Sequence, residues 1–430
     1  MKWKKLLAAG LILPSLITAG DFVFDKKVSA EVLQVENILS VTGIAEVYGD
    51  GEKISTAILE YSKNINAKKI SAADFQVDGK VIESVSVNKN LVTLKFAYEN
   101  TSSNGNLNQK PNRPKNDSPR AGEAPMRSDR KPPDLNFTVK QINKIAAADG
   151  TEILPSEKAV TKISAPVIES FQQKIFTDPA TGNSIPYNIF LPKNYDANKK
   201  YPLVFFVADA SANINEVTTP LFQGNGATSF AAEDFQKKFP CIILAPQYTA
   251  DLVDKLGMMT TDENIWTDGL TLVTNLLFDV IKNYGVDENR IYGTGQSQGG
   301  MANIAISDKY PELFAAQLLV ACQWNVDEMG ILKNKNLWIV VCEGDGKAFP
   351  GMNAAVERWE KLGAKVARNE KFFDSKAPIS ELNKQIKNIE RQRANINYTV
   401  FAGGSHMYTW SFAYNISALR EWLLSSGIVR

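Results

Sequence analysis

The chain carries one serine in a pattern that is typical of a catalytic nucleophile. Ser297 lies in the sequence GQSQG, from Gly295 to Gly299, after the strand-like run RIYGT and before the helix-like run GGMANIAIS. In a nucleophile elbow the serine occupies a strained turn, and the residues two positions away must be small because strand and helix crowd there. The pattern predicts that Ser297 attacks a carbonyl carbon. An ordinary serine in a glycine-rich turn is the alternative.

The only histidine of the chain is the candidate base. His406 lies in FAGGSHMYTW, between the last predicted strand and the last predicted helix. A serine hydroxyl becomes an effective nucleophile when a neighbouring base takes its proton, and histidine suits this role because its pKa lies near neutrality. We therefore predict His406 as the general base, with a purely structural histidine as the alternative.

The acid of such a site lies between the serine and the histidine in chain order. Asp345 follows the strand-like run LWIVVC, and a carboxylate just beyond a strand end can accept the imidazole N–H and stabilise the imidazolium. We predict Asp345 as this acid. Glu343 and Asp374 are the alternatives, and Asp345 in Gly-Asp-Gly could instead be a turn residue.

Acyl transfer also needs two N–H donors that face the developing oxyanion. We predict the backbone amide of Gln298, which follows the nucleophile, as the first donor. The second is expected in the loop after YPLVFFVA, where Ala210 is favoured. An ordinary loop between strand and helix is the alternative there.

Three tryptophans are candidate substrate-binding residues, because they lie near predicted strand ends or beside the motif loops. Aromatic side chains at such places can hold an acyl group or a sugar, although packing in the core or at its rim is their commoner role. These residues are Trp266, Trp324 and Trp410.

Composition excludes several classes of function. Forty-eight basic residues against 47 acidic ones give a formal net charge of +1, so bulk charge does not favour nucleic acid. One histidine and three widely spaced cysteines, Cys241, Cys322 and Cys342, exclude a His-rich zinc site, a CxxC redox pair and a disulfide scaffold. We expect buried free thiols, no metal and no cofactor. The oligomeric state cannot be inferred.

The first residues have the features of an export signal. MKWKKLLAAGLILPSLITAG places lysines before an apolar stretch that glycine and proline interrupt, and it is too short to predict a stable membrane span. A small-x-small site at Val28-Ser29-Ala30 predicts cleavage before Glu31. We therefore expect residues 1–30 to be a signal peptide and the protein to be secreted.

The 430 residues suffice for two domains. Residues 31–165 alternate apolar and polar positions in short runs, which predicts an immunoglobulin-like β-sandwich. The proline-rich stretch 101–134 lacks this pattern and is expected to be a disordered insertion. Residues 166–430 alternate apolar strand runs with helical patterns, which predicts a mostly parallel α/β sheet. The helical patterns include residues 270–284 and one final helix that contains Phe412, Ile416, Leu419 and Leu423.

Together these segments resemble secreted α/β-hydrolase esterases that have an N-terminal immunoglobulin-like domain and a phospholipase/carboxylesterase-like catalytic domain. The resemblance rests on YGDGEKISTAILEYSK, IPYNIFLPKNYD, GNGATSF, CIILAPQY, YGTGQSQGGM, EGDGKAFPGMNA and NYTVFAGGSHMYTW. It implies the α/β-hydrolase fold, Ser297 as nucleophile and His406 as base. Many members carry His-Gly where this chain has Ala208-Asp209, and an acid where it has Lys347.

The sequence thus predicts a serine esterase that hydrolyses small or polymer-linked carboxylic esters through Ser297, His406 and Asp345 and an acyl-enzyme intermediate. A serine peptidase of the same fold is one alternative. The other is an exported protein without catalysis that binds glycan or the cell envelope. The sequence does not distinguish acyl chain lengths.

Overall fold

A computed structural model describes residues 37–98 and 131–427. The predicted signal peptide, and the predicted insertion up to residue 130, lie outside this described part. Within it, the first strands form two main sheets. The larger has the order β10-β1-β2-β5-β4 and the smaller the order β3-β6-β9. Their bounds are β1 Ile38–Tyr48, β2 Gly51–Tyr61, β3 Phe75–Val77, β4 Ile82–Asn88, β5 Leu91–Phe96, β6 Thr138–Gln141, β9 Ser156–Ala159 and β10 Lys162–Ser164.

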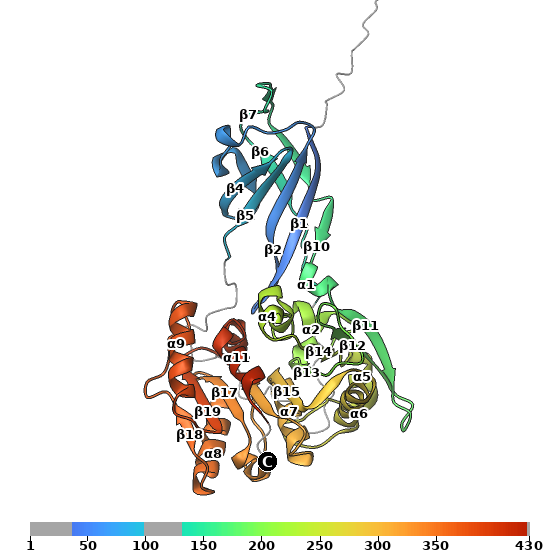
Figure 1. The fold of residues 1–430 in the computed structure, drawn as a ribbon, viewed down its shortest axis with the longest axis vertical. Coiled ribbons are helices and arrows are strands. Elements are labelled where there is room, and N and C mark those ends of the chain that lie inside the picture. The colour runs from blue at the N-terminus through green and yellow to red at the C-terminus, as the bar shows by residue number, and fades with distance from the viewer. Residues whose placement is uncertain (1–36, 99–130, 428–430) are drawn as a thin grey trace, which may run out of the picture. The chain divides into compact units, whose positions relative to one another are not determined.

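Alternating burial explains why these sheets pack face to face. In β5, Val92, Leu94 and Phe96 are buried whereas Leu91 and Lys95 are exposed. Residues from both sheets and from the connections between them form one apolar cluster, as in an immunoglobulin-like sandwich. The strands appear in blue and green in Figure 1.

The second sheet is mostly parallel, with the strand order β11-β12-β14-β13-β15-β16-β17-β19-β18 in the described residues. Strands β13 to β19 pair in parallel, and β11 and β12 are antiparallel to their neighbours. All residues of β14, β16, β17 and β19 are buried. The bounds are β11 Gln172–Thr177, β12 Ser184–Phe190, β13 Tyr201–Val207, β14 Ile242–Pro246, β15 Val286–Gln296, β16 Ala316–Val320, β17 Leu337–Cys342, β18 Val366–Arg368 and β19 Ile396–Phe401.

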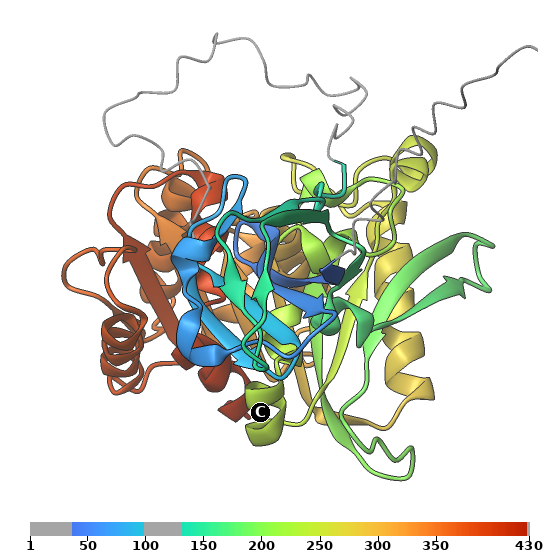
Figure 2. The same ribbon diagram turned by 90° about the horizontal axis from the view of Figure 1, so that it is seen from above.

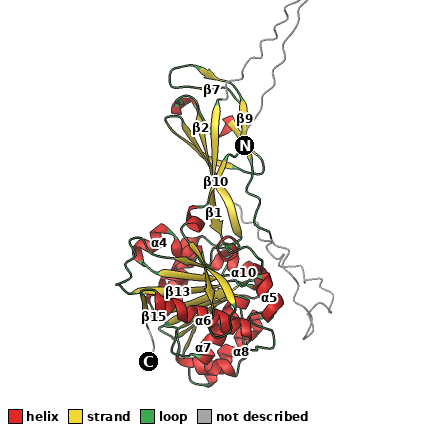
Figure 3. Cartoon of the chain, turned by 90° about the vertical axis from the view of Figure 1, so that its right-hand side faces the viewer, coloured by secondary structure: helices red, strands yellow, loops and turns green. Residues whose placement is uncertain are grey.

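Helices cover both faces of this sheet, which explains its continuous apolar strands. The buried side chains of α6 (Asp268–Asn283), α7 (Gln298–Lys309) and α8 (Ala348–Lys361) form one cluster with one face. Those of α4 (Glu233–Lys238), α9 (Ile379–Glu390), α10 (His406–Ala413) and α11 (Ser417–Ser425) form a second cluster with the other face. Helix α6, yellow in Figure 2, lies toward β12, and α9 lies toward β18. Figure 3 shows the strands between red helices.

Short elements make the remaining connections. They are β7 (Ile145–Ala146), β8 (Glu152–Ile153), α1 (Pro166–Glu169), α2 (Thr219–Phe222), α3 (Thr228–Ala231), α5 (Ala250–Leu256) and the 3-10 helices η1 (Ala67–Lys69), η2 (Ala72–Asp74), η3 (Ala210–Ala212) and η4 (Glu328–Asn334). The search for helices long and apolar enough to cross a bilayer found none among the described residues.

The single final helix predicted from the sequence is wrong. The chain forms α10 and α11 instead, with Ile416 in an extended conformation between them. The side chain of Asn383, on α9, accepts hydrogen bonds from the amide of Ala418 at 2.9 Å and from the hydroxyl of Ser417 at 3.3 Å. This cap at the start of α11 comes from a distant helix, and apolar spacing alone does not reveal it.

Candidate active site

Ser297 occupies the sharp turn that the sequence predicts. It lies between the last residue of β15 and the first residue of α7, with φ 51° and ψ −121°. This backbone conformation is strained for a residue other than glycine. A Cβ atom at Gly295 or at Gly299 would lie 2.5 Å or 1.9 Å from the carbonyl oxygen of Val207. Both positions therefore need glycine, because strand β13 passes directly beside the turn.

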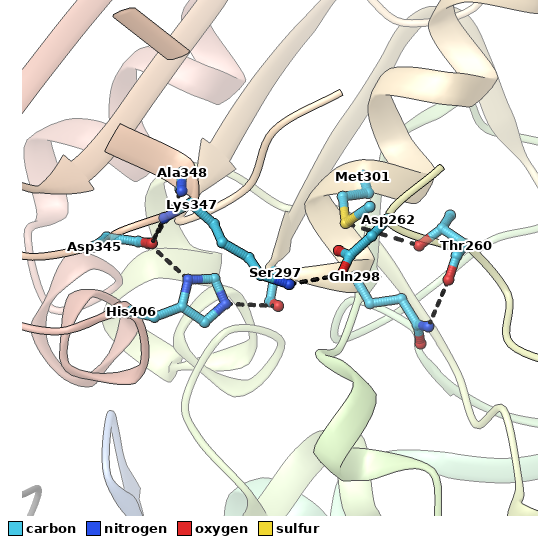
Figure 4. A network of polar contacts seen from close by, with 9 residues as sticks. All are labelled: Thr260, Asp262, Ser297, Gln298, Met301, Asp345, Lys347, Ala348 and His406. Carbon is cyan, nitrogen blue, oxygen red and sulfur yellow. Dashed lines mark hydrogen bonds and ion pairs between the residues drawn. The ribbon is translucent and has the colours of Figure 1, made fainter. Parts of the chain in front are cut away.

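The structure brings the three predicted polar residues into one hydrogen-bonded chain (Figure 4). The Nε2 atom of His406 lies 2.8 Å from Oγ of Ser297, and its Nδ1 atom lies 2.6 Å from Oδ2 of Asp345. Ser297 follows β15, Asp345 follows β17 and His406 follows β19. They meet because the carboxyl ends of these parallel strands share one edge of the sheet.

Asp345 is held as a buried, ionised acceptor. Its side chain is 1% exposed, and its Oδ1 atom accepts hydrogen bonds from the amides of Lys347 at 3.0 Å and Ala348 at 2.9 Å. Burial opposes ionisation, but the hydrogen bond and charge of His406 and the two amides outweigh it, so the pKa of Asp345 is lowered. The alternatives Glu343 and Asp374 are exposed and hydrogen-bond to the backbone amides of other residues.

Two glycine contacts hold the aspartate loop against the histidine loop. The amide of Gly344 donates to the carbonyl of Gly403 at 2.9 Å. A Cβ atom at Gly344 would lie only 2.0 Å from the carbonyl oxygen of Gly404, which itself has φ +70°. Larger residues at these positions would separate the loops and lengthen the bond between Asp345 and His406.

The local structure also orients the imidazole. His406 is the first residue of α10, and the Ser405 side chain caps this helix by accepting from the amide of Tyr408. Trp410, one helical turn further along, packs against the imidazole with ring centroids 5.2 Å apart and planes at 87°. Of the three tryptophans predicted to bind substrate, Trp410 alone contacts this group of residues.

The two amides predicted to bind the oxyanion belong to Gln298, which follows Ser297, and to Ala210, in the loop after β13. Gln298 and Ala210 are the first residues of α7 and η3, where helix geometry leaves amides without an internal acceptor. Neither amide donates a hydrogen bond to another described residue. Val207 pairs with Gly295 in the sheet, which brings the loop after β13 alongside the elbow. The placement fits the oxyanion-binding role predicted for both amides.

The other two predicted tryptophans line a separate pocket. Trp266 and Trp324 face a space of about 360 Å³ whose lining includes Asp308 and Glu328 but neither Ser297 nor His406. The indole N–H of Trp324 donates to Glu328 at 2.8 Å, and that of Trp266 donates to Thr271 at 2.8 Å. The structure therefore places these two residues away from the nucleophile.

Asp308 is a half-buried acid in this pocket, and its two carboxylate oxygens are buried. Neither carboxylate oxygen has a hydrogen-bond partner among the described residues. Burial, aided by the nearby charge of Glu328, raises its pKa to about 7. The unfolded chain releases this proton near pH 4, so Asp308 destabilises the fold increasingly as pH rises from about 4 to about 7 and by a constant amount above.

We therefore expect Asp308→Asn to stabilise the protein by about 2 to 4 kcal/mol at pH 8, and by clearly less at pH 5. Urea unfolding at both pH values measures the difference. Asp287→Asn is the matched control: hydrogen bonds from Arg290 and Asn289 outweigh burial and lower the pKa of Asp287, so its replacement should destabilise at neutral pH. An equal gain for Asp308→Asn at pH 5 and pH 8 would contradict the prediction.

Lys347 links the aspartate loop to the loop that contains Asp262. Its Nζ atom lies 2.6 Å from Oδ2 of Asp262, and Asp262 follows Thr260, whose carbonyl accepts a hydrogen bond from the side chain of Gln298 at 3.4 Å. Lys347 and Asp262 are about 60% exposed. Figure 4 shows the lysine extending from the aspartate loop to Asp262.

Exposed ion pairs of this kind contribute about 1 kcal/mol or less. We therefore expect Lys347→Met to change kcat/KM for a small ester by less than about fivefold. Steady-state kinetics with an aryl acetate measure this. A loss of about a thousandfold would instead make the Lys347 side chain part of the catalytic machinery.

The described residues also bear on metal binding and on the state of the cysteines. No group of three or more His, Cys, Asp or Glu side chains in that part of the chain could hold a metal ion. The three cysteines are free and buried, as predicted. Burial raises the pKa of the Cys241 and Cys342 thiols to about 12, so neither thiol is a reactive nucleophile at neutral pH.

The sequence interpretation missed one set of residues beside Ser297. The carboxylate of Asp209 is buried and accepts hydrogen bonds from the side chains of Gln223 and Gln296. In the sequence, Asp209 stands out only because many related chains carry His-Gly where this chain has Ala208-Asp209. Aspartates in loops often accept a hydrogen bond from the amide two residues further on, and this tendency could have singled out Asp209.

Comparisons with known proteins concern the N-terminal domain and the fold of the chain. Residues 40–154 match the family model described as "Esterase Ig-like N-terminal domain". The solved structure titled "Crystal Structure of a Thermostable Esterase" superposes with a TM-score of 0.69 and 23% identity, and covers 91% of this chain and 100% of that chain. The feruloyl esterase module from Clostridium thermocellum, solved with sinapinate, gives a TM-score of 0.42 and 14% identity over 60% of this chain and 89% of that one.

One curated protein is similar over a shorter stretch. Feruloyl esterase B of Talaromyces funiculosus is 32% identical over 77 residues, which is 17% of this chain and 22% of that protein. The aligned stretch thus spans about a fifth of that relative. Residues 40–154 thus match an immunoglobulin-like N-terminal domain of esterases, and the sheet and helices that follow have the α/β-hydrolase fold.

Proposed function

We propose that this protein is a serine carboxylic-ester hydrolase that uses Ser297, His406 and Asp345 as its catalytic triad. The observation that carries the proposal is the continuous hydrogen-bonded chain from Oγ of Ser297 through the imidazole to the buried carboxylate. Two free amides beside the nucleophile complete what acyl transfer needs.

The geometry supports a two-step reaction. Nε2 of His406 takes the proton from the Ser297 hydroxyl while Oγ forms a bond to the ester carbonyl carbon. The carbonyl oxygen becomes an oxyanion, which the amides of Gln298 and Ala210 stabilise. When the intermediate collapses, the bond to the alcohol oxygen breaks, and His406 gives its proton to the departing alcohol.

Hydrolysis of the acyl-enzyme repeats these steps with water. His406 removes a proton from the water as its oxygen attacks the acyl carbon, and the proton then returns to Oγ of Ser297 as the acid leaves. Throughout, the carboxylate of Asp345 accepts the Nδ1–H of His406 and stabilises the imidazolium. Its lowered pKa keeps it ionised in the neutral range.

The similarity to feruloyl esterase B adds one specific substrate class to this proposal. We propose hydroxycinnamoyl esters, such as methyl ferulate, as substrates to compare with aryl acetates and longer acyl esters. We further propose that residues 1–30 direct export, since the lysine-rich start and apolar run have the features of a signal peptide.

Covalent labelling tests the proposed function. A fluorophosphonate probe should label the folded chain at one site, and peptide mass spectrometry should locate the label on Ser297. The same preparation should hydrolyse at least one ester of the panel. A folded protein that neither reacts with the probe nor hydrolyses any ester would favour a binding protein without catalysis.

A further inference from the structure

A buried carboxylate lies beside the nucleophile, and the proposed triad does not use it. Asp209 is 4% exposed and follows β13 by two residues. Because Val207 pairs with Gly295 in parallel, continuing this register places Asp209 beside Ser297. No lysine, arginine or histidine among the described residues forms an ion pair with Asp209. A buried charge without a cation is costly unless several donors surround it.

Hydrogen-bond donors from three segments surround this carboxylate. Its Oδ1 atom accepts from the amide of Ser211 at 2.8 Å and from the hydroxyl of the same residue. Its Oδ2 atom accepts from the side-chain amide of Gln223, at the end of α2, and from that of Gln296 at 3.3 Å. Gln296 immediately precedes Ser297. Asp209 thus joins its own loop to the nucleophile turn.

Ala210 lies between Asp209 and Ser211, which these hydrogen bonds hold in place. Asp209 caps η3, the Ser211 amide bonds back to the carboxylate, and the Ala210 amide between them is left without an acceptor among the described residues. We propose that Asp209 is a positioning residue: its carboxylate holds the loop 209–211 against Gln296, so that the Ala210 N–H faces the substrate oxyanion. This inference rests on the proposed esterase function.

The chemistry of the network favours a carboxylate in this place. An ionised carboxylate accepts up to about four hydrogen bonds, and four donors converge on Asp209. The side-chain oxygens of Gln223 and Gln296 have no partner among the described residues, so both amides direct their N–H groups to Asp209. An alanine there would leave the loop without its anchor.

Asp209→Ala is therefore expected to lower kcat by about 10² to 10³, the usual effect of losing one oxyanion donor, with KM changed less than about threefold. A second readout isolates the oxyanion site. A boronic acid that forms a tetrahedral adduct on Ser297 should lose affinity by a similar factor, while a planar product acid should bind the variant and the wild type alike. If Asp209 only stabilised the fold, the Asp209→Ala variant would bind both ligands more weakly or would bind both as the wild type does.

Two variants serve as controls. Asp209→Asn keeps a side-chain oxygen that can accept from Ser211. Its side-chain NH₂ group can donate to the unpartnered oxygens of Gln223 and Gln296. The kcat of this variant should therefore lie within about tenfold of the wild-type value. Asp196→Ala removes a similar aspartate turn, in which the carboxylate accepts from the amide of Asn198 at 3.0 Å, at an exposed loop. Its kcat should equal that of the wild type.

Wild-type kcat and boronate affinity in a folded Asp209→Ala protein would overturn the proposal. If that variant does not fold, Gln296→Ala replaces it, with an expected loss of about tenfold in kcat, and unchanged kinetics there would equally overturn it. These results would leave the esterase function standing, because the wild type would still hydrolyse esters. A wild type that hydrolyses none would remove both proposals.

Discussion

Ser297→Ala is expected to lower kcat for ester hydrolysis by about 10⁶, to the residual rate that binding and oxyanion stabilisation provide. The alanine cannot form the acyl-enzyme, so the reaction loses its two-step route. The fold should change little, because the backbone amide of residue 297 still donates to the carbonyl of Val320 at 3.0 Å. Steady-state kinetics and fluorophosphonate labelling measure the effect, and labelling should disappear.

Ser170→Ala is the matched control, since Ser170 is exposed and its hydroxyl donates only to the carbonyl of Val167 among the described residues. It should keep both activity and labelling. If Ser297→Ala retained more than about a hundredth of the wild-type rate, a different nucleophile would have to be sought, and the proposed triad would be wrong.

The sequence could predict the meeting of Ser297, Asp345 and His406 because each follows an apolar strand run. Parallel strands point their carboxyl ends to one edge of the sheet, so residues just beyond three such strands gather there without any knowledge of contacts. The strained turn at Ser297 also has a local origin, since both flanking glycines are visible in the motif.

The positions of Trp266 and Trp324 could not be predicted in this way. Trp324 lies in the loop after β16 and Trp266 in the loop before α6, and the direction of a loop side chain depends on the path of the loop and on its partners. The bonds from Trp324 to Glu328 and from Trp266 to Thr271 turn both rings toward the pocket beside α7.

Contacts between distant segments explain the remaining differences between the structure predicted from the sequence and the observed one. Asn383 caps α11 from another helix, and Asp209 gathers Gln223 and Gln296 from two other segments. Such hydrogen bonds leave no periodic pattern in the sequence, because each one depends on a single polar residue. The apolar pattern therefore predicts where strands lie, but not which polar residue caps a helix or holds a loop in place.

Asp345→Asn is expected to fold normally and to lower kcat by about 10³ to 10⁴. The asparagine oxygen can still accept from the amides of Lys347 and Ala348, as Oδ1 of Asp345 does now. Its NH₂ group would then face Nδ1 of His406 and donate to it. That bond favours the tautomer with the proton on Nε2, which can no longer take the proton of Ser297.

Glu343→Gln and Asp374→Asn are the matched controls for this change. Glu343 follows β17 and Asp374 lies beyond β18, but both acids are exposed, and neither is hydrogen-bonded to His406. Their variants should keep kcat within about threefold of the wild type. Near-normal kcat in Asp345→Asn, together with a large loss of kcat in one control, would identify Glu343 or Asp374 as the acid instead. Because only Asp345 lies 2.6 Å from Nδ1 of His406, the loss is expected in that variant alone.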